Sequence, residues 1–163
     1  MSQDAPRPPQ EATLQLDIVS AEAALFSGPV RQLTLKGFDG ELGIHPGHSA
    51  LLTPLLPGVA RFLPQGQQEE DFLYVSGGMV EVQPERVIVL ADTALRSEEI
   101  DEQAAREAQR RAREIMEESV LFSDRDAAHA ELMRALAQLK VVEHARRVAR
   151  RRKDASPGAA TGP

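Results

Sequence analysis

The spacing of apolar residues changes once along this chain, at Ser97, and that change limits what the chain can fold into. Before Ser97, apolar and polar residues alternate. In "TLQLDIV", Leu14, Leu16 and Ile18 fall on one side, a period of two that is typical of half-buried β-strands. After Ser97, apolar residues recur every three or four positions, as in amphipathic helices. We therefore expect a β-unit over residues 13–95 and a helical unit over residues 96–153.

The β-unit contains several further short runs with turn-forming residues between them: "VRQLTLKG", "SALLTPLL", "VARFL", "DFLYVSG", "MVEVQ" and "RVIVLAD". Gln32 interrupts the alternation of the first run. The Asp39-Gly40 pair indicates a hairpin, because glycine accepts a positive φ. We assign "SGG" at Ser76–Gly78 to another hairpin turn. Many short strands with no helical period between them predict an antiparallel sandwich or barrel.

The helical unit reads as two helices joined by a short connection, an antiparallel hairpin. Ser97 is the candidate N-cap of the first helix. Its apolar stripe is narrow and rich in alanine: Ile100, Ala104, Ala108, Ala112 and Ile115. Ser123 or Asp124 is expected to cap the second helix, whose apolar face is Ala128, Leu132, Ala135, Leu136, Leu139 and Val142. Alanine buries little apolar area, so we expect a weakly held hairpin.

Composition excludes several classes of protein. There is no cysteine, which rules out a disulfide framework, a thiolate nucleophile and a Cys-ligated zinc site. No apolar run approaches the ~20 residues that span a bilayer, and "MSQDAPRPPQEA" lacks the apolar core of a signal peptide. We expect a soluble cytoplasmic protein, with residues 1–12 as a disordered arm and residues 154–163 as a disordered tail.

No constellation of catalytic or metal-binding residues stands out. His45 and His48 flank a Pro-Gly turn, but only Glu41 lies near enough in sequence to complete a ligand set, so we expect no metal site. Pro46 and Gly47 more simply impose a rigid turn. The "SGG" run lacks the Gly-x-Ser-x-Gly elbow and a following helix. The carboxylates show no paired arrangement that would support general acid–base catalysis.

The chain ends in a basic helix. Six cations fall in eight residues: Arg146, Arg147, Arg150, Arg151, Arg152 and Lys153. A solvated helix end is the commonest role for such a run, since cations complement the dipole at a helix C-terminus. An acidic protein surface is the second possibility. Nucleic acid is disfavoured because the protein has a net charge of −6, no Trp and one Tyr, so stacking platforms are scarce.

Four segments in order, "LDIVSAEAALFSG", "GELGIHPGHSALLT", "YVSGGMVEVQPERVIVLADTA" and "AQLKVVE", closely resemble the epsilon subunit of F-type ATP synthase. The resemblance covers roughly residues 13–145. It implies a ten-stranded β-sandwich and a C-terminal helical hairpin, in a non-catalytic subunit of the central stalk. It places the protein at the cytoplasmic face of the bacterial inner membrane, between the gamma subunit and the ring of c subunits.

The resemblance also implies roles for individual residues. Gly40, Glu41 and Leu42 would lie on the turn that faces the c ring, and His48 would lie near gamma. The hairpin would permit turnover when docked on the sandwich and would block ATP hydrolysis when extended into the alpha/beta catalytic head. The candidate basic contacts in that extended state are Arg106, Arg110, Arg111, Arg113 and Arg134.

Two features depart from the family pattern. Some relatives bind ATP through Ile/Leu-Asp-x-x-Arg-Ala, but this chain has "IDEQAA", with Ala104 where the Arg would stand. We therefore expect no ATP cofactor, because alanine offers no donor to a phosphate. The second departure is the Arg-rich extension after Val148. The competing hypothesis is a free-standing β-sandwich adaptor whose basic helix binds an acidic protein or nucleic acid. The two hypotheses differ in one observation, because only a rotor subunit is expected to co-purify with gamma from solubilised membranes.

Overall fold

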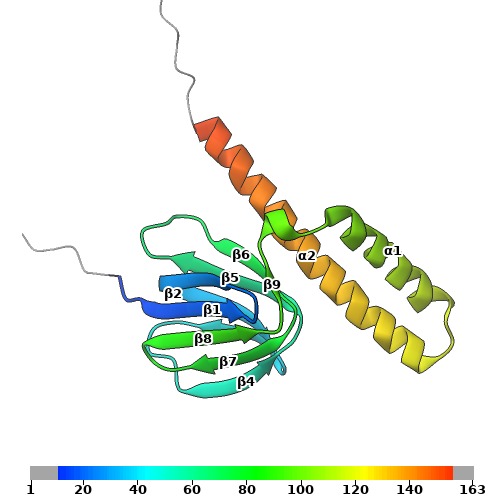
Figure 1. Ribbon diagram of the computed structural model, residues 1–163, viewed down its shortest axis with the longest axis horizontal. Helices are drawn as coiled ribbons and strands as arrows, with labels where there is room; N and C mark the ends of the chain where they lie inside the picture. The colour runs from blue at the N-terminus through cyan, green and yellow to red at the C-terminus, as the bar shows by residue number, and fades with distance from the viewer. Residues whose placement is uncertain (1–10, 156–163) are drawn as a thin grey trace, which may run out of the picture.

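The computed structural model describes residues 11–155, which form a β-sandwich with a helical hairpin packed against one side (Figure 1). The helical part consists of a short 3-10 helix η1 (Ser97–Glu99) and two helices, α1 (Glu102–Glu118) and α2 (Phe122–Ala155). The strands of the sandwich are β1 (Leu14–Ser20), β2 (Ala24–Gly37), β3 (Gly40–Ile44), β4 (Leu51–Leu55), β5 (Gly58–Pro64), β6 (Asp71–Val75), β7 (Gly78–Val82), β8 (Arg86–Ala91) and β9 (Ala94–Leu95).

The sandwich has two layers that share strand β2. The first half of β2 pairs with β1, and its second half pairs with β3 and β5. The pairing with β5 shifts between Val30 and Gln32, at the point where the sequence pattern was interrupted. Such a bulge bends and twists a strand. One layer therefore runs β4-β7-β8-β1-β2, and the other runs β3-β2-β5-β6-β9.

The core between the layers is built from the inward positions of the alternating strands. Leu14, Leu16 and Ile18 on β1 are 0–1% exposed, as the alternation predicted. They pack with inward residues of the other strands, among them Phe62 on β5 and Val80 on β7. The core cluster contains only apolar side chains, which suits two sheets packed face to face.

Two details of the strand pairing differ from the expectation of an antiparallel fold with a hairpin at Ser76–Gly78. First, β1 and β8 pair in parallel, because they are distant in sequence and no turn constrains their direction. Second, β6 and β7 do not pair with each other; β6 pairs with β5 and β9, and β7 with β4 and β8. The "SGG" segment is therefore a crossover between the two layers, so the hairpin interpretation was wrong. The Asp39-Gly40 hairpin is confirmed by the pairing of Gly37 with Gly40.

The helices begin at other residues than expected. Ser97 belongs to η1, and the N-cap of α1 is Asp101, whose Oδ1 accepts a hydrogen bond from the backbone N of Ala104 at 3.0 Å. Helix α2 begins at Phe122, before the expected caps Ser123 and Asp124. It continues through Asp154 and Ala155, so the start predicted for the C-terminal tail was too early. The rest of that tail and residues 1–10 of the predicted arm lie outside the described residues.

Gly78 supports a sharp test of the layer crossover. Its φ is +126°, and a Cβ added there would lie 2.0 Å from the backbone oxygen of Leu90. Gly78→Ala should therefore lower the free energy of unfolding by at least about 2 kcal/mol, from backbone strain and collision with β8. Chemical denaturation measures the change.

Gly43→Ala is the matched control, because Gly43 lies on β3 with open space at its Cβ position and no positive φ. It should change stability by less than about 1 kcal/mol. Equal effects from the two variants would contradict the close approach of β7 and β8 at Gly78.

Candidate interaction surfaces

The hairpin is docked on the outer face of β5 and β6. Tyr74 on β6 is only 3% exposed, although it points away from the sandwich core. It forms a second apolar cluster with Ile100 of the connecting segment and with Ala137, Val141 and Val142 of α2. Val59, Phe72 and Leu95 border this cluster. Because these side chains would meet water in the absence of α2, their burial favours the docked arrangement.

Helix α2 uses a different side to contact α1. At about 100° per residue, Ala128 and Ala135 lie roughly opposite Ala137 and Val141. Both helices bury alanines in this seam, with Ala105 and Ala112 on α1 and Ala128 and Ala135 on α2. A seam of methyl groups allows close approach but removes little apolar area from water. Alanines thus supply all of the buried side chains that α1 contributes to this seam.

The apolar stripe expected on α1 is wrong by one position at two of its members. Ala104 is exposed and Ala105 is buried in its place, and Ile115 is 41% exposed while Met116 is partly covered. Ile100 lies before the helix and packs against the sandwich instead. The expected stripe assumed that the helix begins near Ser97 and includes Ile100. Because α1 begins at Glu102, after the Asp101 cap, Ile100 does not belong to the helix and does not define its buried face. On α2, Ala128, Ala135, Leu139 and Val142 are buried, and Leu132 and Leu136 partly so.

The five basic residues singled out in the sequence do not form one cluster. Arg106 pairs with Glu102 at 2.7 Å, Arg110 is 3.9 Å from Glu114, and Arg111 is 3.9 Å from Glu131. Arg113 and Arg134 form no ion pair with the described residues. All five are exposed. Exposed pairs contribute only ~0.2–1 kcal/mol each, so these cations are readily available to another partner.

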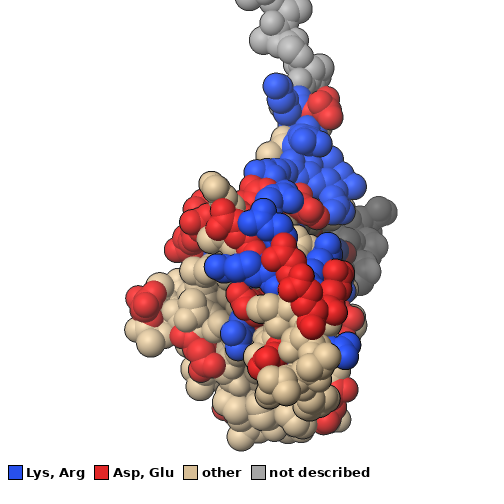
Figure 2. Space-filling view, turned by 90° about the vertical axis from the view of Figure 1, so that its right-hand side faces the viewer, with Lys and Arg blue, Asp and Glu red and all other residues tan. Residues whose placement is uncertain are grey.

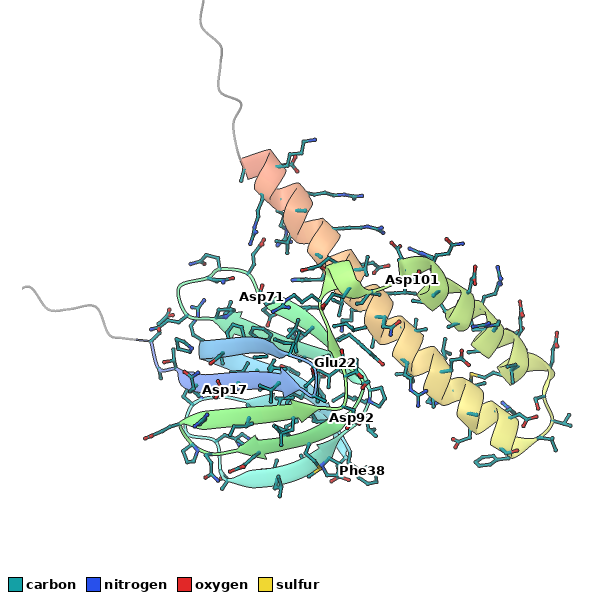
Figure 3. All side chains as sticks on the ribbon, viewed as in Figure 1. Asp17, Glu22, Phe38, Asp71, Asp92 and Asp101 are labelled. Atoms are coloured by element: carbon teal, nitrogen blue, oxygen red, sulfur yellow. The ribbon has the colours of Figure 1, made fainter. Side chains whose placement is uncertain are left out.

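A groove of about 740 Å³ lies between α1 and α2. Its charged lining residues are Glu99, Asp101, Arg111, Glu131 and Arg134, and Ala104 lines the α1 side. The first turn of α1 adjoins it, and Asp101 at that turn is labelled in Figure 3. Five alanines, Leu95 and Ile100 supply the apolar part of the lining, and no aromatic side chain lines the groove.

Gly40, Glu41 and Leu42 lie on the β2–β3 hairpin, where Gly40 adopts a φ of +132°. The Glu41 carboxylate is exposed and 3.6 Å from the guanidinium of Arg61. Leu42 packs against the edge of the core. Phe38, at the tip of this hairpin, is 66% exposed. Figure 3 shows Phe38 at the end of the sandwich away from the C-terminal end of α2.

His48 lies beyond the opposite end of β3. The backbone N of Gly47 donates to the oxygen of Pro84 at 2.8 Å, and the N of His48 donates to the oxygen of His45 at 3.1 Å. Gly47 has a φ of +84°. These bonds hold the loop as a tight turn against the β7–β8 connection. Within residues 11–155, no three His, Asp or Glu side chains gather as a metal ligand set would.

An apolar row on the outer face of the β4-β7-β8-β1 layer escaped the sequence analysis. The register aligns Pro54 with Met79, Met79 with Leu90, and Leu90 with Val19, so these side chains cross four strands side by side. Leu90 is 55% exposed, and Leu52 beside the row is 67% exposed. Contiguous apolar residues exposed on a sheet face are a common feature of protein-binding surfaces. The sequence did contain a sign of this row. Apolar residues stand at positions of the alternating strands that face outward, where polar residues are usual.

The charged residues are distributed unevenly over the helical side. Figure 2 shows Lys and Arg gathered toward the upper part of the molecule and uncharged residues toward the lower part. Glu102, at the start of α1, accepts hydrogen bonds from both Arg146 and Arg106, which lower the pKa of its carboxyl. No helix in residues 11–155 is long and apolar enough to cross a membrane.

The described surface thus combines an exposed apolar row on one sheet layer, an exposed hairpin turn and a helical hairpin packed on the sandwich. Comparisons with known proteins identify the family. Residues 13–97 match the beta-sandwich domain of the ATP synthase Delta/Epsilon chain, and residues 98–143 match its long alpha-helix domain. The chain belongs to the ATP synthase delta/epsilon chain family, which confirms the resemblance and the fold class derived from the sequence.

Individual relatives cover most of the chain. The ATP synthase epsilon chain of Halorhodospira halophila is 49% identical over 140 residues, which are 86% of this chain and 99% of that protein. A chain of the Euglena gracilis mitochondrial ATP synthase shares the fold with a TM-score of 0.67 and 23% identity, covering 88% of both chains. A chain of the Tetrahymena thermophila mitochondrial enzyme has a TM-score of 0.50 and 14% identity, covering 82% of this chain and 98% of its own length.

Proposed function

We propose that this chain is the epsilon subunit of a bacterial F-type ATP synthase and serves as a non-catalytic part of its rotor. It would couple proton flow through the c ring to ATP synthesis in the catalytic head. Besides family membership, the supporting observation is the exposed apolar row from Pro54 to Val19, which is suited to binding another protein. The protein would be peripheral, at the cytoplasmic face of the inner membrane, held there by the complex.

Two partners fit two separate ends of strand β3. We assign the turn of Gly40, Glu41 and Leu42 to the c ring, because it presents an exposed carboxylate beside an exposed Phe38. We assign His48 to the gamma side, together with the apolar row. The short β3 strand and the hydrogen-bonded turn after it are rigid, which suits a part that transmits torque between two partners.

Glu41→Arg tests the ring-facing turn. The residue is exposed, so the fold should remain intact, while the reversed charge should weaken the contact with the ring. We expect ATP-driven proton pumping in inverted membrane vesicles, normalised to ATP hydrolysis, to fall about two- to fivefold, the range that one exposed charge supports.

Glu117→Arg, an equally drastic change at an exposed site near the far end of α1, is the matched control and should leave coupling unchanged. Wild-type coupling in the Glu41 variant would remove Glu41 from the ring interface.

The hairpin supplies the regulatory role. Docked as in this structure, it would permit turnover; extended into the catalytic head, it would block ATP hydrolysis. Its cations Arg106, Arg110, Arg111, Arg113 and Arg134 would then meet an acidic surface of the head. The thin alanine seam supports this proposal, because a two-state element requires the two arrangements to differ by only a few kcal/mol.

Removing the hairpin should therefore activate the enzyme. Truncation after Leu95 should raise ATPase activity of the assembled complex about three- to tenfold, and reversing Arg110, Arg111 and Arg113 to Glu should raise it partially. Added salt should imitate the reversal, since screening shortens the reach of exposed charges to about 8–10 Å near physiological strength.

The matched control reverses three exposed acids of the same helix, Glu107, Glu114 and Glu117, to Arg, and should not activate. Unchanged hydrolysis after truncation at low salt would show that inhibition is not the role of this hairpin.

We also propose that the groove between α1 and α2 does not bind ATP. Ala104 occupies the position of the motif arginine, and Arg111 is directed to Glu131, leaving Arg134 as a lone cation without a charged partner among the described residues. A nucleoside triphosphate needs several hydrogen-bond donors that converge on its phosphates, and this lining supplies too few.

Titration calorimetry on the isolated chain checks the absence of ATP binding. Millimolar ATP should give little or no heat, while Ala104→Arg, which restores the motif, should bind measurably tighter. A micromolar dissociation constant for the unaltered chain would mean that other residues, Arg134 first among them, complete an ATP site.

A further inference from the structure

Helix α2 extends beyond the residues that match the family's helical domain. The match to the family's helical domain ends at residue 143, whereas α2 ends at Ala155, twelve residues later (155 − 143 = 12). We call residues 144–155 the α2 extension. It contains the six clustered cations noted in the sequence. The helix dipole accounts for cations at a helix C-terminus, but it does not account for the specific contacts that these residues make.

The extension contacts the sandwich along one stripe. The ring of His144 stacks on Phe72, with centroids 3.7 Å apart and planes at 4°. Its Nε2 lies 2.7 Å from the backbone oxygen of Glu70, within hydrogen-bond distance. Two turns later, Nη1 of Arg151 lies 3.6 Å from Oε1 of Glu69. The sandwich-facing stripe of α2 that begins with Ala137 and Val141 thus continues into the extension and becomes polar.

The acidic segment that receives the extension, residues 69–71, is held by the sandwich itself. The Glu70 carboxylate accepts a hydrogen bond from Nε2 of Gln32 at 2.7 Å and lies 3.6 Å from Nε of Arg61. Its side chain is therefore directed into the sandwich, which leaves its backbone oxygen for His144. Asp71, labelled in Figure 3, lines a groove of about 350 Å³ together with His144 and Arg152.

The extension also holds α1. Arg146 forms a two-pronged ion pair with Glu102, the first residue of α1, with Nη1 2.9 Å from Oε1 and Nη2 in contact with Oε2. Glu102 is the same carboxylate that Arg106 contacts within α1. One helical segment therefore reaches β6, the loop before it and the start of α1. All of these contacts are lost when the hairpin leaves the sandwich and its helices separate.

We propose that the α2 extension is an intramolecular anchor that holds the hairpin docked, with the acidic segment 69–71 and Glu102 as its binding sites. The effect of the anchor on catalysis rests on the proposed inhibitory function of the extended hairpin. The anchoring of the docked hairpin does not depend on that function. If the extended hairpin inhibits, the anchor opposes inhibition. Deleting the extension alone should then lower ATPase activity, whereas deleting the whole hairpin raises it. A general basic tail with no binding site would not produce this reversal of sign.

Docking is measured on the full isolated chain by distances between two spin labels. The chain has no cysteine, so Leu52→Cys on β4 and Val120→Cys at the hairpin tip accept labels uniquely, and both positions are exposed. Ending the chain after Glu143 should raise the undocked population about tenfold. Each exposed contact changes the docking equilibrium constant by a factor of ~1.4 to 5, and truncation removes several of them together. Ending it after Ala155 is the matched control. Val141→Asp, which buries a charge against Tyr74, supplies the undocked reference.

A charge-swap cycle tests the specific pairing. Arg151→Glu and Glu69→Arg should each raise the undocked population about two- to fivefold, and the double variant should restore docking. Arg147→Glu is the control cation, because Arg147 forms no ion pair with the described residues. Salt at 0.5 M should favour undocking in the full chain and have little effect after truncation at Glu143.

The outcomes separate the anchor from the inhibitory function. An unchanged distance distribution after truncation at Glu143, or equal undocking by Arg147→Glu and Arg151→Glu, would overturn the anchor. Increased undocking with lower ATPase activity in the assembled enzyme supports both proposals. Increased undocking with unchanged ATPase activity supports the anchor and refutes the inhibitory role of the hairpin.

Discussion

Burial of the outer face of β5 and β6 under α2 is the contact on which the arrangement of the whole molecule depends. Strand β6 carries apolar side chains on both faces, Leu73 and Val75 toward the core and Phe72 and Tyr74 away from it. An apolar outer face of a sheet is stabilised when another element shields it from water, and here α2 does so. Because α1 contacts α2 far more than the sandwich, its position follows from that of α2.

The two parts are held together by different kinds of contact. The sandwich encloses a core of Leu, Ile, Val and Phe that strands distant in sequence contribute jointly. The hairpin is held by a small apolar cluster, a seam of alanine methyls and a set of exposed polar contacts. A rigid body carrying a loosely held element is the construction expected of a subunit that transmits force through one part and responds through the other.

Some of the charged contacts act inside the molecule, where the sequence suggested contacts with other proteins. Arg106 and Arg146 converge on Glu102, and Arg151 approaches Glu69. In the docked state these cations neutralise acids of the same chain. Each such pair is weak in water, so an acidic partner of comparable charge density can compete for the cations. The proposed extended hairpin would place the same cations against an acidic partner instead.

The sequence alone determined much of the local structure, because strand alternation and helical period depend on neighbours along the chain; the Ser97 cap and the "SGG" hairpin were exceptions. Alternation predicted β1, the Asp39-Gly40 pair predicted the β2–β3 hairpin, and the 3.6-residue period predicted both helices. Gln32 was noted only as an interruption, and the structure places a bulge there. The tertiary structure decided which strands pair, because pairing joins residues with no local signal between them. The layer crossover at Gly77–Gly78, the parallel β1–β8 pair and the apolar row from Pro54 to Val19 all depend on register.

The tertiary structure also decided how the helices dock. Ala137 and Val141, omitted from the predicted helix face, contact Tyr74, and the basic extension contacts residues some seventy positions earlier in the chain. A helix with two apolar sides does not reveal which partner each side will find; only the shape and charge of the folded sandwich determine that.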